Sequence, residues 1–103
     1  MITQTPEPPY YAVVFTSIRT DGDNGYTEMD EYLEELVQHI PGYIGIESAR
    51  QDMGISVSYW SSLEAIKEWK EAMVHVAAQK YGKEKWYSTY KVRVCKVERD
   101  YGF

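Results

Sequence analysis

The sequence has very little cysteine and no long apolar run. Its 103 residues include a single cysteine, Cys95, so no internal disulfide can form. Because Cys95 lies in a strand-like run, we interpret it as a small buried hydrophobe. No segment approaches the ~20 apolar residues that a helix needs to cross a bilayer. Residues 1–9 show no signal-peptide pattern, and a cytoplasmic location fits these absences.

Positive charge is also scarce. Lysine and arginine number 11 against 16 aspartate and glutamate residues, which gives a net charge of -5. Nucleic acids and membrane surfaces attract basic patches, so we expect neither as a partner. The length corresponds to one domain, large enough for a core without disulfides or metals.

The chain lacks the strong catalytic and cofactor motifs. It has no GxGxxG, no phosphate loop ending in GK[ST] and no HExxH. Two histidines and one cysteine are too few and too scattered for a zinc site. No Ser-His-acid triad can be assigned from spacing. The sequence therefore predicts neither a metal nor a bound cofactor.

The order of hydrophobic patterns is the most informative feature that is present. Strand-like and helical runs alternate as β-α-β-β-α-β, the ferredoxin-like α+β arrangement, which predicts an antiparallel sheet with two helices on one face. The expected elements are strands at 10–19, 43–50, 55–60 and 90–97, and helices at 26–40 and from Ser62. Residues 1–9, with three prolines, are an expected extended arm; 10–99 form the domain and 100–103 a tail.

Local signals mark the ends of these elements. Pro41 and Gly42 are expected to stop the first helix. Ser61 followed by Glu64 predicts a capping box at the start of the second helix, with Ser61 as N-cap. Residues 51–54 are the expected hairpin turn between the second and third strands.

The first strand-like run is apolar on both faces. A strand that is exposed on one face alternates apolar and polar residues, and residues 10–18 do not. This run is therefore an expected central strand that is covered twice. Helices account for one face, so a second copy of the chain is the expected cover of the other.

Aromatic content is unusual, with 10 Tyr, 3 Trp and only 2 Phe. Tyrosine and tryptophan combine an apolar body with a polar group, so they suit both interfaces and binding pockets. One interpretation is a tyrosine-rich core and dimer interface, and the other is a pocket for a flat aromatic ligand. Both can hold together.

The second helical run contains the candidate site residues. Trp69, Met73 and Val76 share one face by spacing, and His75 flanks it. Histidine titrates near neutral pH, so a pocket histidine could move protons, whereas a surface one would not. His39, at the end of the first helix, is interpreted as structural.

The segments PGYIGIES, ISVSYWSSLEAIKEWK and VHVAAQKYG resemble the antibiotic biosynthesis monooxygenase family. The resemblance extends over about residues 9–99, and its signatures are residues 41–47, Tyr59-Trp60-Ser61 and Trp69. It implies a dimeric α+β barrel, a homodimer whose sheets pack face to face, with a pocket between each sheet and its helices. Some members oxidise polycyclic aromatic substrates with dioxygen and no cofactor, and others degrade haem.

The resemblance leaves two hypotheses for the function. The first is a cofactor-independent monooxygenase acting on a small aromatic or polyketide-like substrate. Its substrate-binding candidates are Trp60, Trp69 and Met73, and its catalytic candidates are His75 and Tyr59, either of which would take or hold a proton. The alternative is a non-catalytic protein of the same fold that binds a small ligand or is associated with stress.

Two departures argue against haem degradation. The haem-degrading members use an asparagine on the first strand, and this chain has none between Tyr10 and Thr20. They also space a tryptophan and a histidine by nine or ten residues on the second helix. Here Trp69 and His75 are six apart, and Gln79 stands at the tenth position.

Overall fold

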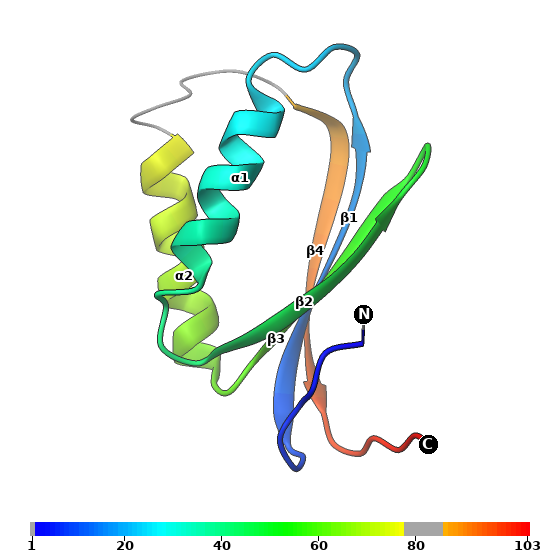
Figure 1. The fold of residues 1–103 in the computed structure, drawn as a ribbon, viewed down its shortest axis with the longest axis vertical. Coiled ribbons are helices and arrows are strands. Elements are labelled where there is room, and N and C mark those ends of the chain that lie inside the picture. Colours follow the sequence, from blue (N-terminus) through cyan, green and yellow to red (C-terminus); the bar gives the residue numbers. More distant parts are fainter. Residues whose placement is uncertain (1, 78–85) are drawn as a thin grey trace.

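A computed structural model describes residues 2–77 and 86–103 and confirms the predicted β-α-β-β-α-β order (Figure 1). The strands are β1 (Tyr10–Arg19), β2 (Tyr43–Arg50), β3 (Gly54–Trp60) and β4 (Tyr87–Val97), and the helices are α1 (Tyr26–Val37) and α2 (Leu63–Val76).

The four strands form one antiparallel sheet in the order β2-β3-β1-β4. Strand β1 is central, as its two-sided apolar pattern predicts, and β2 and β4 are the edges. Both helices lie on one side of the sheet (Figure 1). We call that side the inner face and the opposite side the open face. Tyr11 and Val13 belong to the inner face, because they pack against the core cluster of Val37, Trp60 and Ala65.

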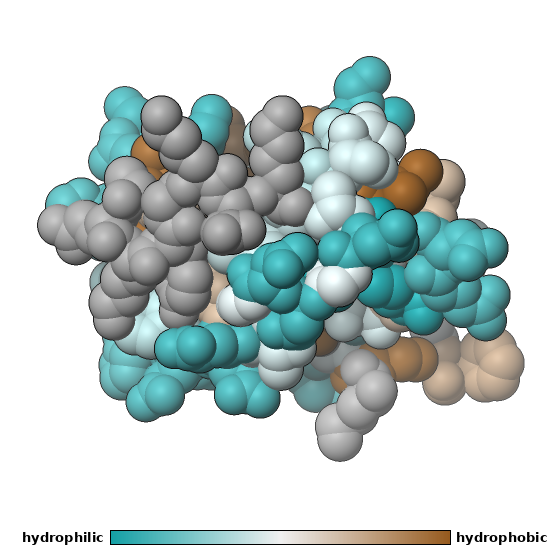
Figure 2. All heavy atoms as spheres, turned by 90° about the horizontal axis from the view of Figure 1, so that it is seen from above, coloured by the Kyte–Doolittle hydropathy of each residue, from teal (hydrophilic) through white to brown (hydrophobic). Residues whose placement is uncertain are grey.

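Helix α1 begins after a glycine turn. Gly25 has a φ of 85°, a left-handed conformation that favours glycine. The carboxylate of Asp23 accepts a hydrogen bond from the backbone N–H of Thr27 at 3.2 Å, which satisfies one free donor of the first turn. The end of the molecule that carries this loop is mainly hydrophilic over its described surface (Figure 2).

Helix α1 ends earlier than the spacing predicts, at Val37 instead of Ile40. The next residues form tighter turns, in which the N–H of His39 bonds the carbonyl of Leu36 at 3.1 Å. Gly42 then reverses the chain with a φ of 94°. A Cβ at this position would lie 2.7 Å from the Cβ of Ala65, so only glycine fits between the turn and α2.

The predicted N-cap of α2 is wrong by one residue. The cap is Ser62, whose Oγ accepts a hydrogen bond from the N–H of Ala65 at 3.1 Å. With Ser62 as N-cap, the third helical position is Ala65, so the expected capping box with Glu64 does not form. Ser61 instead donates its backbone N–H to the carbonyl of Gly42 at 2.8 Å.

The N-terminal arm and the C-terminal tail contact the open face. The N–H of Thr3 donates to the Glu47 carboxylate at 2.8 Å, and the Thr3 side chain lies against Gly45, where a Cβ would come within 2.5 Å of it. The hydroxyls of Thr5 and Tyr10 both donate to Asp100. One end of the open face is thus covered by the chain itself.

Candidate functional site

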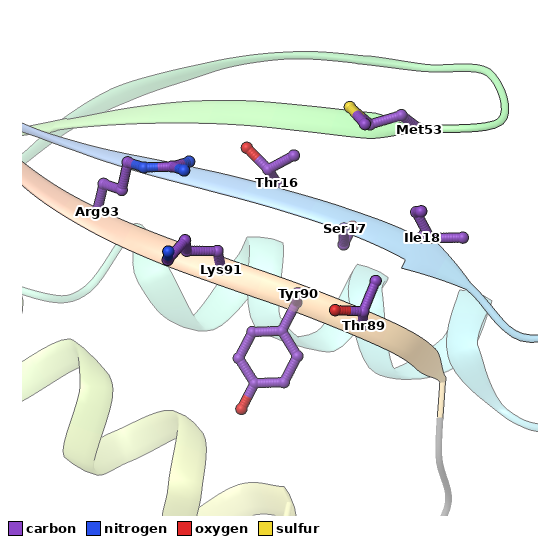
Figure 3. A pocket seen from close by; sticks show the side chains of 8 residues that line it. All are labelled: Thr16, Ser17, Ile18, Met53, Thr89, Tyr90, Lys91 and Arg93. Carbon is purple, nitrogen blue, oxygen red and sulfur yellow. The ribbon is translucent and has the colours of Figure 1, made fainter.

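An apolar strip on β4 faces the helix side of the sheet but is not covered by the helices. The register places Val92 beside Phe15 and Val94 beside Val13, which fixes these side chains on the inner face. Tyr90, Val92 and Val94 are nevertheless 63%, 50% and 53% exposed. Figure 3 shows Tyr90 pointing from β4 toward the helices. We call these three residues the β4 strip. Exposed apolar side chains gathered in one place often mark a binding surface.

Helix α2 contributes two predicted site residues to the same side. Trp69 and Met73 are partly buried and share a helix face with Ala65 and Val76, both buried. Trp69 stacks on Trp60 with ring centroids 6.4 Å apart and an angle of 29° between the planes. Trp60 is completely buried, and its indole N–H donates to the Ser58 hydroxyl at 2.8 Å. The three predicted substrate-binding residues therefore all lie between sheet and helices.

An aromatic triad continues this surface toward the other end of β1. The rings of Phe15, Tyr87 and Tyr90 lie 5.2 to 6.1 Å apart, centroid to centroid. Edge contacts of this kind contribute about 0.5–1.5 kcal/mol each beyond the buried area. Burial raises the pKa of the Tyr87 phenol far above its ordinary value, and a hydrogen bond with Tyr26 adds to the shift. Tyr87 is therefore a neutral hydroxyl at physiological pH.

The guanidinium of Arg50 lies at one end of the aromatic triad, and we call this end the polar end of the inner surface. Arg50 reaches across Gly54 to β1, where it donates to the hydroxyl and, at 3.5 Å, to the carbonyl of Ser17. Ser17 is 1% exposed and is the neighbour of Tyr90 in the sheet. A Cβ at Gly54 would lie 2.1 Å from the guanidinium carbon, so the glycine makes room for the arginine.

Two further charges lie near this end. Desolvation raises the pKa of Asp30, on α1, while Arg19 and Arg50 partly offset the rise. The guanidinium of Arg19 lies 3.5 Å over the Tyr26 ring and donates to the carbonyl of Gly22. Its Nε is the one buried side-chain polar atom without a hydrogen-bond partner among residues 2–77 and 86–103.

The two predicted catalytic residues do not join this surface. Tyr59 lies on the opposite face of β3 from Trp60. On this open face its hydroxyl donates a hydrogen bond to Glu47 at 2.7 Å. Burial, followed by this bond to the carboxylate, raises the pKa of Tyr59 to about 12. His75 is exposed and lies with Lys67, Lys70 and Val74 on the outer side of α2. The structure thus separates both from Trp60 and Trp69.

The open face carries a shallow hollow of about 300 Å³ near the hairpin tip. Figure 3 shows Met53 on one side of it and Lys91 and Arg93 rising from β4 on the other. Cys95, predicted to be buried, is exposed. It pairs with Ala12 in the sheet, and its strand is an uncovered edge in the isolated chain.

The described residues include neither a candidate metal site nor a candidate membrane-spanning helix. No group of three or more His, Cys, Asp or Glu within residues 2–77 and 86–103 is arranged to hold a metal ion. Over the same residues, no helix is long and apolar enough to span a membrane.

Sequence reasoning missed the polar end of the inner surface. Arg50, Ser17 and Tyr87 lie in three strands, and only the register of the sheet brings them together. An arginine at a hairpin end gave no signal by itself. Gly54 pairs with both Ser17 and Arg50 and has no side chain, so the Arg50 guanidinium can cross β3 and reach Ser17.

Comparison with known proteins gave one related sequence at high identity. The chain is 46% identical over 100 residues to YqjZ of Bacillus subtilis (strain 168), an uncharacterized protein, and the match covers 95% of this chain and 88% of YqjZ. No family model matches the sequence.

Solved structures share the fold at low sequence identity. A protein of Caulobacter crescentus CB15, proposed to be an antibiotic biosynthesis monooxygenase, has a TM-score of 0.71 at 12% identity, covering 88% of this chain and 92% of its own. SnoaB, a cofactor-independent oxygenase from Streptomyces nogalater, gives 0.70 at 9%, covering 90% and 97%. A mutant of MhuD with manganese protoporphyrin IX gives 0.68 at 16%, covering 90% and 99%.

Proposed function

Because the chain belongs to the same family as YqjZ and has the antibiotic biosynthesis monooxygenase fold, we propose that it is a cofactor-independent monooxygenase of a small aromatic or polyketide-like substrate. One observation carries the proposal: the β4 strip stays half exposed on the inner face, the face on which Trp60 stacks with Trp69 of α2. Fold alone does not define a reaction, so the argument rests on this surface.

The surface suits a flat aromatic molecule. The β4 strip and Phe15 offer an apolar floor, and Trp69 and Met73 stand on the helix side. Aromatic rings bound against such side chains lose water and gain stacking contacts. Holding the substrate in one orientation against apolar side chains contributes to the rate and needs no protein-bound redox group.

The proposed chemistry uses the acidity of the substrate. An anthrone-like compound loses a C–H proton to give an anion, which passes one electron to dioxygen. The two radicals combine into a peroxide, which loses water to give the quinone. One substrate and one dioxygen are consumed, and one quinone and one water are formed. Desolvation and orientation of the anion are the tasks of the protein.

In this proposal, solvent takes the C–H proton of the substrate. Tyr59 points to the open face and donates to Glu47, and its pKa of about 12 keeps it protonated near neutral pH, so it is not available as a base. His75 lies on the outer side of α2. A role for either residue in proton transfer would require contact with the substrate, and both lie away from the inner face on which the substrate is proposed to bind.

The described residues do not fit a haem site of the kind known in some family members. A histidine ligand would have to face the sheet from α2, and His75 faces outward. The first strand has no asparagine, as the sequence shows. Gln79, at the tenth position after Trp69, lies outside the described residues. No step through haem is therefore proposed.

A homodimer is part of the proposal. Val14, Val57 and Ile55 lie on the open face, next to the buried Ala12, and neither α1 nor α2 covers them. A second copy packed sheet against sheet would cover these side chains and complete the family arrangement. The exposed position of Cys95 in the single chain is consistent with this cover.

Oxygen uptake tests the function. Purified protein, with no metal or cofactor added, is mixed with 1,8-dihydroxyanthrone in an oxygen electrode. We expect uptake above the buffer rate, with one dioxygen consumed per quinone formed. Trp69→Ala should lower the rate, whereas Val74→Ala, on the outer side of α2, should not. Uptake equal to that of buffer would contradict the proposal.

One observation favours the non-catalytic alternative. Both titratable candidates, Tyr59 and His75, lie away from the inner aromatic surface. A protein that binds an aromatic ligand without turnover needs only that surface. Binding of the anthrone without uptake above the buffer rate would support this alternative.

A further inference from the structure

The inner face carries a positive charge in a protein of net negative charge. Arg50 lies at the hairpin end of β2, and its guanidinium extends over Gly54 to the buried Ser17. The net charge of the chain is -5. The Arg50 guanidinium is therefore a positive charge held in a fixed place on the sheet of a chain whose net charge is negative.

This charge lies next to the aromatic triad. Ser17, which accepts from Arg50, is paired with Tyr90 and is two residues from Phe15 on the same face of β1. The charge of Arg50 also acts on the Tyr87 phenol. The aromatic surface thus ends at a guanidinium.

The guanidinium retains donors for a ligand. Arginine has five N–H donors, and the hydrogen bonds of Arg50 within the described residues both go to Ser17. The residue is exposed, so its remaining donors can be reached. The bonds to Ser17 fix the plane of the group, which reduces the entropy that a ligand must offset.

Asp30, on α1, is an acidic group whose charge interacts with that of Arg50. Its carboxylate interacts with both Arg50 and Arg19, and its pKa is raised because it is partly desolvated. A bound anion would share the positive field with this carboxylate. Removing the charge of Asp30 should therefore strengthen the binding of an anion, whereas removing Arg50 should weaken it.

We propose that Arg50, held by Ser17, binds the acidic group of a flat aromatic ligand whose rings lie along Phe15 and the β4 strip. The ligand class is an aromatic compound bearing a carboxylate, phenolate or enolate. This inference rests on the proposed function and specifies which substrates the inner surface takes. Guanidinium and carboxylate form two parallel charge-assisted hydrogen bonds, which select for an anion over a neutral amide of the same shape.

Calorimetric titration with two matched probes tests the inference. The probes are 2-naphthoate and 2-naphthamide, which share their rings and differ in charge. We expect the native protein to bind 2-naphthoate about tenfold more tightly, the ratio expected for one charged hydrogen-bonded contact. Arg50→Gln should abolish this ratio and leave the affinity for 2-naphthamide within about twofold. Asp30→Asn should raise the ratio.

Arg99→Gln is the matched control. It makes the same chemical change beyond β4, at the opposite end of the sheet, and should leave the ratio unchanged. If Arg50→Gln does not fold, Asp30→Asn decides the question by tightening 2-naphthoate alone. Equal affinities of the native protein for both probes would overturn the inference while the aromatic site stands. Failure of both probes to bind would overturn the inference and count against the proposed site as well.

Discussion

Two tryptophans that stack on each other differ in exposure. Trp60 is completely buried between Tyr43 and Trp69, whereas Trp69 is partly exposed on the inner side of α2. A side chain with no exposed surface can act only through packing. One that keeps exposed surface beside an apolar strip can also contact a ligand.

Alanine substitutions should separate these two roles. Trp60→Ala should cost about 3–5 kcal/mol of unfolding free energy, because it leaves a large cavity in the core. Trp69→Ala should cost less and should weaken the binding of 2-naphthoate about threefold to tenfold through lost stacking. Urea unfolding and titration on the same samples measure both effects. Loss of stability with unchanged affinity would leave Trp69 a purely structural residue.

Glu47 links the arm to the sheet in a manner that depends on pH. The backbone N–H of Thr3, then the Tyr59 hydroxyl, lower the pKa of this carboxyl below its ordinary value of 4.5. A depressed folded-state pKa means that the stabilisation is complete above 4.5 and is lost as the pH falls through the folded value.

Glu47→Gln should therefore be less stable than the native protein at pH 7, and the difference should shrink as the pH falls below 4.5. Urea unfolding of both proteins at several pH values gives the measurement. Glu64→Gln, on the exposed first turn of α2, is the control for loss of one negative charge. A difference that stays constant from pH 7 to pH 3 would show that the carboxylate is not held by these donors.

Some of the site could be predicted from single residues and some could not. The spacing of Trp69 and Met73 correctly gave the inner side of α2. Tyr59 and Trp60 are neighbours on one strand, and neighbours on a strand point to opposite faces, so they could not share one site. The place of Arg50 depends on strand register, which the pattern of one sequence does not define.

At the scale of the element, the serine pair before α2 is a direct test of the N-cap. Ser62→Ala should cost about 1 kcal/mol, because the N–H of Ala65 loses its acceptor. Ser61→Ala should cost much less, since that residue contributes a backbone bond to Gly42 that alanine retains. Thermal or urea unfolding of the two variants compares them. The reverse order would restore the cap predicted from the sequence.

The elements themselves were largely predictable, and their ends were not. Strands β1 and β2 have the expected bounds, whereas β3 begins one residue and β4 three residues earlier than expected. Two adjacent serines are chemically equal as caps, so the sequence could not choose between them. Helix α1 stops at Val37 because the following turns replace its regular bonds, before Pro41 is reached.

At the scale of the whole molecule, neither α1 nor α2 covers the open face of the sheet. The helices cover the inner face only, and the arm and tail cover one end of the open face. Stable homodimers bury about 1,600 Å² or more in total. We expect the proposed sheet-to-sheet dimer to bury an area in this range.

Val14→Lys should disrupt the proposed dimer, because Val14 lies at the centre of the open face between Val57 and Arg93. In sedimentation equilibrium we expect the native protein at twice its chain mass of 12.0 kDa and the variant at the chain mass. Val74→Lys, on the outer side of α2, should leave the dimer intact. A native protein that sediments as a monomer at micromolar concentration would contradict the sheet-to-sheet dimer.

The placement of the tryptophans also gives the protein its own optical reporter. All three, Trp60, Trp69 and Trp86, are buried or partly buried, so emission should be shifted to the blue with little contribution from water-exposed indole. Trp60 and Trp69, with centroids 6.4 Å apart, are close enough for their excited states to couple. Such coupling splits the indole bands in circular dichroism into a couplet of opposite signs. A ligand that binds in contact with Trp69 would change the couplet, so binding to the inner surface can be followed without any label.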